Sequence, residues 1–166
     1  MKKLMGVTAV AVVLAAPAFA QTGGTQLTGQ VQAVCAVIDP LLDMEFDSMT
    51  SSSSVSDNFS IQCNDADGAT MKLQSSEGGL ENDDNEDQVV HYVAVINGTA
   101  FNGLTLDTQA IANVPNGQND IFVTDTKPGS TSLASGQTGS LDVSHGGGAI
   151  WAGGYSDTLT LQLTAN

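Results

Sequence analysis

The sequence contains no arginine and very few basic residues of any kind. Its 166 residues include 4 Lys+Arg against 18 Asp+Glu, which gives a formal net charge of −14. Nucleic-acid binding depends on clustered basic side chains that neutralise phosphates, so this composition excludes a nucleic-acid-binding protein. Substrates with phosphate or carboxylate groups would also lack the arginine clamps that usually hold them.

Recognisable catalytic motifs are missing as well. The sequence has no His-Glu-x-x-His pair, no glycine-rich phosphate loop and no nucleophile elbow. Its two histidines are His91 and His145, and the neighbours Ser144 and His145 would point to opposite faces of a strand. We therefore predict structural or surface histidines and a protein without enzymatic activity.

Long apolar runs are absent except at the N-terminus. There, Lys2 and Lys3 precede an apolar core over residues 7–16, and the small-x-small site Ala18-Phe19-Ala20 follows. This order predicts a secretory signal peptide of bacterial type over residues 1–20, cleaved after Ala20. The apolar core is too short for a stable membrane span, and we expect no span in the rest of the chain.

Cleavage at this site would leave a strongly acidic chain. Removal of 20 of the 166 residues leaves 146, enough for a single domain with a real core. Two of the four lysines leave with the signal, so Lys72 and Lys127 remain against 18 acidic residues and the net charge becomes −16. We expect mutual repulsion to keep such a surface soluble in salt.

Cysteine is scarce, and the two that occur are Cys35 and Cys63. An even pair in an exported chain predicts a disulfide, here closing a loop of 27 residues. A metal site built on these two thiols is the less favoured alternative, because neither histidine lies at ligand spacing from them.

Helical periodicity is almost absent, since Gly, Ser, Thr, Asn and Asp recur every few residues. Between them lie short alternating runs that predict an all-β antiparallel sandwich of eight or nine strands. Met49–Asp57 is predicted to be a serine-rich connector and Ser75–Gln88 an acidic loop. The predicted strands and short apolar pieces are 25–38, 41–46, 57–63, 69–75, 88–96, 99–106, 120–124, 139–144 and 155–165.

The last of these runs has the clearest alternation. Leu159, Leu161 and Leu163 are predicted to face the core. Thr158, Thr160 and Gln162, which lie between or beside them, are predicted to face outward.

The acidic loop is the best candidate for metal binding. It places Glu81, Asp83, Asp84, Glu86 and Asp87 within seven residues. Asp83, Asp84, Glu86 and Asp87 could hold Ca²⁺ weakly, although a solvated loop is the commoner outcome of such a run. We expect no other cofactor.

Three stretches together resemble a known family. They are "GQVQAVCAVIDP", "LLDMEFDSM" leading to "FSIQCNDADG", and the terminal "AGGYSDTLTLQLTAN". In this order they are similar to the spore coat protein U domain family, which includes subunits of archaic chaperone–usher pili. The Gly-Tyr-x-Asp-Thr core of the ending, at Gly154–Thr158, is the most specific piece.

This resemblance implies an immunoglobulin-like sandwich over residues 35–166 that lacks one strand. Subunits of this kind expose a hydrophobic groove between two unpaired edges. A periplasmic chaperone lends the missing strand, and the N-terminal extension of the next subunit replaces it after export through an outer-membrane usher. This donor-strand complementation is a form of β-augmentation.

On this interpretation residues 21–34 are the donor segment of a fibre subunit. The residues that would plug the groove are Leu27, Gly29, Val31 and Ala33. The residues implied for the groove edge of the final strand are Tyr155, Leu159, Leu161 and Leu163. The alternative is that Gln26–Val37 is the ordinary first strand of a complete sandwich.

Two functions therefore stay open from the sequence. The first is a structural subunit of a bacterial pilus or fimbria, secreted through the periplasm to the cell surface and used in adhesion or biofilm formation. The second is a stand-alone extracellular β-sandwich that binds carbohydrate or Ca²⁺ through Trp151 and the acidic loop.

Overall fold

The computed structural model of the chain describes residues 23–111, 121–149 and 151–166. The predicted signal peptide and the first two residues of the predicted donor segment lie outside these ranges. The chain divides into two units, Met1–Val31 and Gln32–Asn166. Within the first unit, residues 23–31 have neither helix nor strand, and their side chains are exposed.

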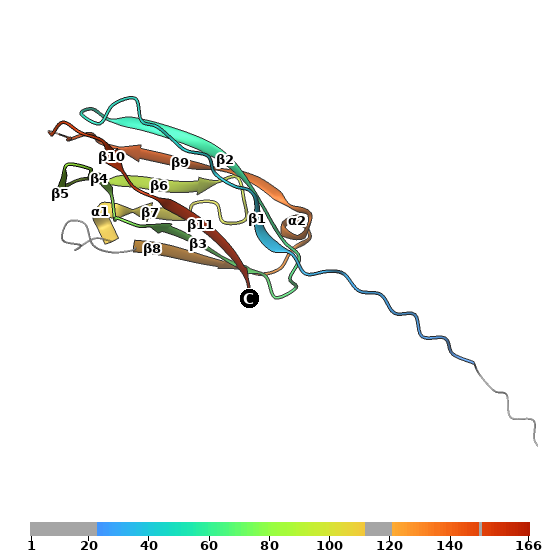
Figure 1. Ribbon diagram of the computed structural model, residues 1–166. Helices are drawn as coiled ribbons and strands as arrows, with labels where there is room; N and C mark the ends of the chain where they lie inside the picture. The colour runs from blue at the N-terminus through green and yellow to red at the C-terminus, as the bar shows by residue number, and fades with distance from the viewer. Residues whose placement is uncertain (1–22, 112–120, 150) are drawn as a thin grey trace, which may run out of the picture. The chain divides into compact units, whose positions relative to one another are not determined.

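The unit Gln32–Asn166, called the domain below, is built from short antiparallel strands (Figure 1). Its two helices, α1 (Thr108–Ile111) and α2 (Thr131–Ser135), are far too short and polar to cross a membrane, and the described residues contain no other candidate. The strands are β1 (Cys35–Asp39), β2 (Ser53–Cys63), β3 (Ala69–Ser75), β4 (Leu80–Asn82), β5 (Asn85–Val90), β6 (Tyr92–Asn97), β7 (Thr105–Asp107), β8 (Ile121–Lys127), β9 (Gln137–His145), β10 (Tyr155–Ser156) and β11 (Leu159–Ala165).

These strands form three antiparallel sheets, which confirms the all-β prediction. A five-stranded sheet has the order β1-β2-β9-β6-β7, and a three-stranded sheet has the order β11-β3-β8. A second three-stranded sheet, β10-β4-β5, is much smaller. In Figure 1, β2, β9 and β6 lie side by side, and β11 runs along β3 and β8.

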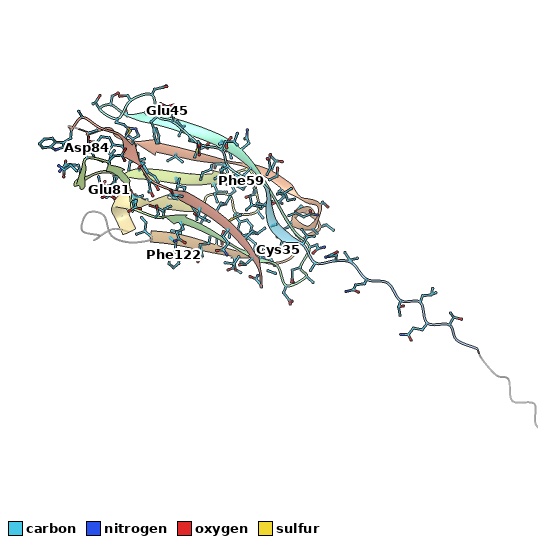
Figure 2. All side chains as sticks on the ribbon, viewed as in Figure 1. Cys35, Glu45, Phe59, Glu81, Asp84 and Phe122 are labelled. Carbon is cyan, nitrogen blue, oxygen red and sulfur yellow. A yellow bond between two sulfur atoms is a disulfide. The ribbon has the colours of Figure 1, made fainter. Side chains whose placement is uncertain are left out.

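One hydrophobic core receives side chains from both large sheets. Phe59 and Ile61 of β2 and Met71 and Leu73 of β3 are all 0% exposed and belong to the same cluster. Phe59 is labelled in Figure 2. Each pair is separated by one outward-facing residue, as the two-residue period of a strand requires. The sheets therefore enclose a common core in a sandwich-like arrangement.

The predicted disulfide is present and joins β1 to β2. Cys35 and Cys63 lie opposite each other in the register of the two strands. Beside the disulfide, Asn64 accepts a hydrogen bond from Val34 N–H at 2.8 Å and donates one to the Gln32 carbonyl at 2.8 Å. The Asn64 N–H also donates to the Val34 carbonyl at 2.9 Å. These bonds fix the chain to the domain immediately before β1.

The final strand also has the predicted orientation. Leu163 is buried, Leu159 and Leu161 are partly buried against the core, and Thr160 and Gln162 are exposed. The register places Leu161 opposite Leu73 of β3. The alternation of leucine with polar residues was therefore a reliable guide to the face that packs inward.

The first predicted strand is shorter than expected. Of Gln26–Val37, only Cys35–Val37 lies in a strand, because β2 ends at Cys63, the residue opposite Cys35. Residues before Cys35 have no ladder partner in β2, and alternation in the sequence does not supply one. The apolar piece 41–46 likewise forms no strand.

Four other predictions were wrong in detail. Of the predicted strand 99–106, only Thr105 and Leu106 lie in a strand, β7. Ser53–Asp57 is not part of a connector, because pairing with β9 extends β2 to Ser53. The acidic loop is the hairpin β4–β5, in which Leu80 and Asn82 are buried. The run 88–96 is divided at His91, because β5 pairs with β4 whereas β6 pairs with β9.

Candidate functional site: an apolar groove beside two open strand edges

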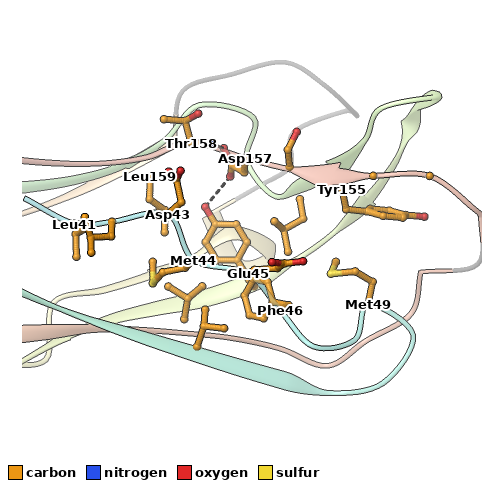
Figure 3. Close-up of a pocket in the computed structure, with 18 residues that line it drawn as sticks. Leu41, Asp43, Met44, Glu45, Phe46, Met49, Tyr155, Asp157, Thr158 and Leu159 are labelled. Atoms are coloured by element: carbon orange, nitrogen blue, oxygen red, sulfur yellow. Dashed lines mark hydrogen bonds between the residues drawn. The ribbon is translucent and has the colours of Figure 1, made fainter.

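A groove with a volume of about 650 Å³ opens along one side of the domain (Figure 3). One wall is the segment between β1 and β2, chiefly residues 41–49, and the other is the segment 153–159 that contains β10 and leads into β11. The side chains between these walls are Val55, Leu80, Tyr92 and Val143. Three of these four are aliphatic, so the floor of the groove is largely apolar.

Two strand edges border this groove without a ladder partner in the described residues. β11 pairs with β3 alone. On the other side, β1 pairs only with Ser60–Cys63 of β2, so β9 is the only strand paired with Ser53–Phe59. β1 lies close to both β2 and β11 and fills the space between them at one end only. Open edges of this kind present free N–H and C=O groups to any strand that can reach them.

The 41–49 segment keeps apolar side chains toward the domain and carboxylates toward solvent. Met44 and Phe46 are partly buried, whereas Asp43, Glu45 and Asp47 are exposed. In Figure 2, Glu45 lies at the same end of the domain as Glu81 and Asp84. The lining of this wall therefore combines apolar side chains, Met44 and Phe46, with the carboxylates of Asp43 and Glu45.

Two hydrogen bonds donated by backbone N–H groups hold this wall in place. The Leu42 N–H donates to Asp57 Oδ2 of β2 at 2.7 Å. Near the other end of the segment, the Ala149 N–H donates to the Met49 carbonyl at 3.1 Å. Between these two bonds the wall is held by side-chain packing. It can therefore adjust to an occupant without breaking backbone hydrogen bonds between strands.

His145 packs against Phe46 of this wall. Its ring meets the Phe46 ring edge-on, with centroids 4.6 Å apart. Its Nδ1 accepts a 2.9 Å hydrogen bond from the Gly147 N–H, and its Nε2 has no partner in the described part of the domain. At 5% exposure His145 is a packing residue. His91 bonds to the Thr108 hydroxyl at 3.1 Å through Nδ1.

Asp157 organises the opposite wall. Its carboxylate accepts hydrogen bonds from the hydroxyl of Ser75 at the end of β3, and from the Ser76 hydroxyl and the Glu77 N–H in the β3–β4 connection. It also accepts one from the Tyr92 hydroxyl at 2.7 Å, drawn as a dashed line in Figure 3. Burial, and then the nearby Asp157 carboxylate, raise the pKa of Tyr92 well above its usual value.

The glycines of the terminal "AGGY" stretch let the acidic hairpin pack against β10. Asp83 N–H donates to the Gly154 carbonyl at 2.9 Å, and Ser156 donates its hydroxyl to Asp83 Oδ1 at 3.2 Å. A Cβ on Gly154 would collide with the Asp83 carboxylate, and Gly153 has a φ of +133°. The Asp83 carboxylate is therefore already in contact with β10 and the residue before it.

The predicted calcium ligands do not form a recognisable site in the described residues. Asp84 is exposed, and the side chains of Glu86 and Asp87 lie outside the description. No group of three or more His, Cys, Asp and Glu side chains in a metal-binding arrangement occurs in the described part of the chain.

The predicted strand-exchange residues fall into two sets: the plug residues of the N-terminal segment and the groove-edge residues of the final strand. Leu27 and Val31 are 91% and 84% exposed, and Gly29 and Ala33 are also exposed. Tyr155 and Leu159 line the groove. Leu161 and Leu163 continue along β11 and pack against the core.

The sequence prediction missed the other groove residues, chiefly Leu41, Met44, Phe46, Tyr92 and Asp157. A signal existed for three of them. Asp157 belongs to the Gly-Tyr-x-Asp-Thr core, and Met44 and Phe46 lie two residues apart in an apolar piece. Tyr92 had no local signal, because its role depends on a carboxylate 65 residues away.

No protein-family model, no curated protein and no solved structure matches this chain. The function is therefore inferred from the groove and its edges.

Proposed function

We propose that the protein is a secreted structural subunit of a bacterial surface fibre, assembled by donor-strand complementation. The fold is then an immunoglobulin-like sandwich with one strand missing, and the groove is the place of that strand. The N-terminal segment of a second copy, or of a related subunit, fills the groove and pairs with its edges.

The observation that carries this proposal is a groove with a largely apolar floor, bordered by two strand edges that have no partner in the described residues. An added strand would bury the groove-lining side chains and pair the free backbone groups in one step. Neither a substrate pocket nor a metal site needs open edges, whereas strand addition does.

The N-terminal segment has a suitable length and pattern to be the donor. Leu27–Ala33 contains seven residues, as does β11, and both would span roughly 23 Å when extended. Leu27, Gly29, Val31 and Ala33 share one face of an extended chain. Their exposure leaves them available for capture by another molecule.

The cellular partners follow from this mechanism. An unfilled groove is an aggregation hazard, so a periplasmic chaperone would occupy it before an outer-membrane usher hands the subunit to the fibre. The signal peptide and the disulfide are suited to this route. At the cell surface the fibre would serve adhesion or biofilm formation.

Deletion of residues 21–31 tests the proposal, because it leaves Gln32 and Val34 bonded to Asn64 and the domain intact. The full mature chain is expected to form polymers, seen by size-exclusion chromatography and electron microscopy. The deletion variant is expected to form no polymers. A full chain that stays monomeric at every concentration without a chaperone would refute the proposal.

One observation favours the alternative, a stand-alone carbohydrate-binding sandwich. Trp151 is 54% exposed, and shortly after it the chain passes through the groove-lining Gly153 and Gly154 into β10, which pairs with the acidic hairpin. Exposed tryptophan is an effective platform for sugar rings. A monomeric full chain whose sugar binding is lost in Trp151→Ala would establish this function instead.

A further inference from the structure

The outer face of the sheet β11-β3-β8 has an unusual composition for so acidic a protein. Its register aligns outward-facing residues in three rows of three, which comprise five threonines, two glutamines, Lys72 and Phe122. Met71 and Leu73, which alternate with them on β3, are fully buried. None of these nine positions is acidic, although the sequence has 18 acidic residues.

Lys72 sits at the centre of this face. Its ammonium lies 4.5 Å from the centroid of the Phe122 ring. Phe122, which is labelled in Figure 2, is 52% exposed. Lys72 has no ion pair in the described residues, whereas Lys127 is paired with Asp125 at 2.8 Å. Lys72 is therefore the basic group on this face that remains available to an anionic partner.

The surroundings of Lys72 supply neutral hydrogen-bonding groups. Thr124 and Gln162 flank it on the neighbouring strands, and the next row contains Thr70 and Thr126, whose hydroxyls are 2.8 Å apart. Hydroxyls and amides of this kind both donate and accept hydrogen bonds, as sugar hydroxyls do. An exposed aromatic ring offers a flat apolar surface to the C–H face of a sugar.

We propose that this face binds a polysaccharide in which isolated carboxylates are separated by neutral sugars. The carboxylate would pair with Lys72, the adjacent ring would stack on Phe122, and neutral sugars would bond to the threonines and glutamines. Elsewhere the net charge of the chain repels an anion, but charges beyond about 8 Å are screened at physiological ionic strength. The local charge at Lys72 therefore decides where such a polymer can approach.

The dimensions of the face also suit a sugar chain. Three strands and three rows cover about 10 Å by 14 Å, which accommodates a short run of rings on a flat surface. A densely charged polymer would meet repulsion from the rest of the protein, so sparse carboxylates are the better match. The binding is independent of the groove and goes beyond the proposed role in fibre assembly.

Gellan is a suitable probe, because its repeat combines neutral sugars with an isolated glucuronate. Binding of the full mature chain would be measured by isothermal titration at low and physiological salt. Carboxyl-reduced gellan is the matched neutral ligand. We expect the native polymer to bind and the reduced one to bind about fivefold more weakly, with the difference shrinking as salt rises.

Matched variants separate this face from the overall charge. Lys72→Gln and Lys127→Gln change the net charge equally, and only the first is expected to weaken gellan binding, by about fivefold. Thr124→Glu should abolish binding, whereas Ser144→Glu, on an exposed position of β9, should leave it unchanged. Phe122→Ala should weaken binding to both polymers.

Each of several results would overturn the proposal. These are the absence of gellan binding by the folded wild type, equal effects of Lys72→Gln and Lys127→Gln, and equal binding of native and carboxyl-reduced gellan. Self-association that Thr124→Glu removes, without any polymer binding, would assign the face to a second copy instead.

Discussion

The Tyr92 hydroxyl donates a 2.7 Å hydrogen bond to Asp157 Oδ2 and so links the two large sheets at the groove. Tyr92 opens β6 of the five-stranded sheet, and Asp157 lies just before β11 of the three-stranded sheet. The same carboxylate binds the end of β3 through Ser75 and the β3–β4 connection through Ser76 and Glu77. The floor and one wall of the groove therefore share a single anchoring group.

Replacement of Asp157 should be costly. Asp157→Ala leaves the Tyr92 hydroxyl, the Ser75 hydroxyl and the Glu77 N–H without their acceptor, and we expect a loss of about 3 kcal/mol in the free energy of unfolding. Urea denaturation of the variant lacking residues 21–31 measures this free energy without interference from polymerisation. Asp67→Ala, at an exposed turn position, is the control and should cost less than about 0.5 kcal/mol. Equal effects of the two would contradict the anchoring role of Asp157.

Ionisation of Tyr92 should also reduce the stability of the fold at alkaline pH. Its pKa in the folded state is raised above the unfolded value of 10.0 by burial and by Asp157. As the pH rises past 10, the unfolded chain loses the phenolic proton first, so the stability of the fold decreases with pH. Tyr92→Phe should flatten this decrease from about pH 10 to about pH 11, roughly the first unit above the unfolded pKa. A Tyr155→Phe control should retain it, and parallel curves for wild type and Tyr92→Phe would contradict the assignment.

Loss of the disulfide should destabilise the domain substantially. The bond closes a loop between residues 28 positions apart, for which the chain-entropy model gives roughly 3–4 kcal/mol. Cys35→Ser combined with Cys63→Ser should lower the unfolding midpoint accordingly in thermal or urea denaturation. A cost below about 1 kcal/mol would mean that Asn64 and the β1–β2 ladder hold this region without it.

The effect on polymerisation of charges placed in the N-terminal segment should depend on which face of the extended chain carries them. Leu27→Asp with Val31→Asp puts two carboxylates on the face predicted to enter the groove, and this variant should not polymerise. Thr28→Asp with Gln30→Asp adds the same charge to the opposite face and should polymerise nearly as well as wild type. Electron microscopy and light scattering would distinguish them, and equal inhibition by both variants would show that charge alone is responsible.

The sequence predicted the features that depend on local alternation. The inward face of β11, the bounds of β3 and the all-β class follow from apolar residues spaced two apart, because that period is a property of every half-buried strand. The disulfide followed from an even cysteine count in an exported chain. These predictions needed no knowledge of which strand pairs with which.

Features that depend on pairing were not predictable in the same way. Serines in Ser53–Ser56 favour a connector locally, yet the partner strand β9 extends β2 through them. The acidic run forms a hairpin because Leu80 and Asn82 are buried against the rest of the domain. Asp157 joins the groove through donors far away in the sequence, so its chemistry became visible only in three dimensions.

Amide hydrogen exchange on β11 tests the central claim most directly. A synthetic peptide of residues 21–34 would be added to the variant lacking residues 21–31, and exchange would be followed residue by residue across Leu159–Ala165. If the groove accepts this segment as a strand, β11 amides that point away from β3 should become protected, and a peptide carrying Asp at positions 27 and 31 should protect none. Unchanged exchange in β11 at saturating peptide would contradict the account.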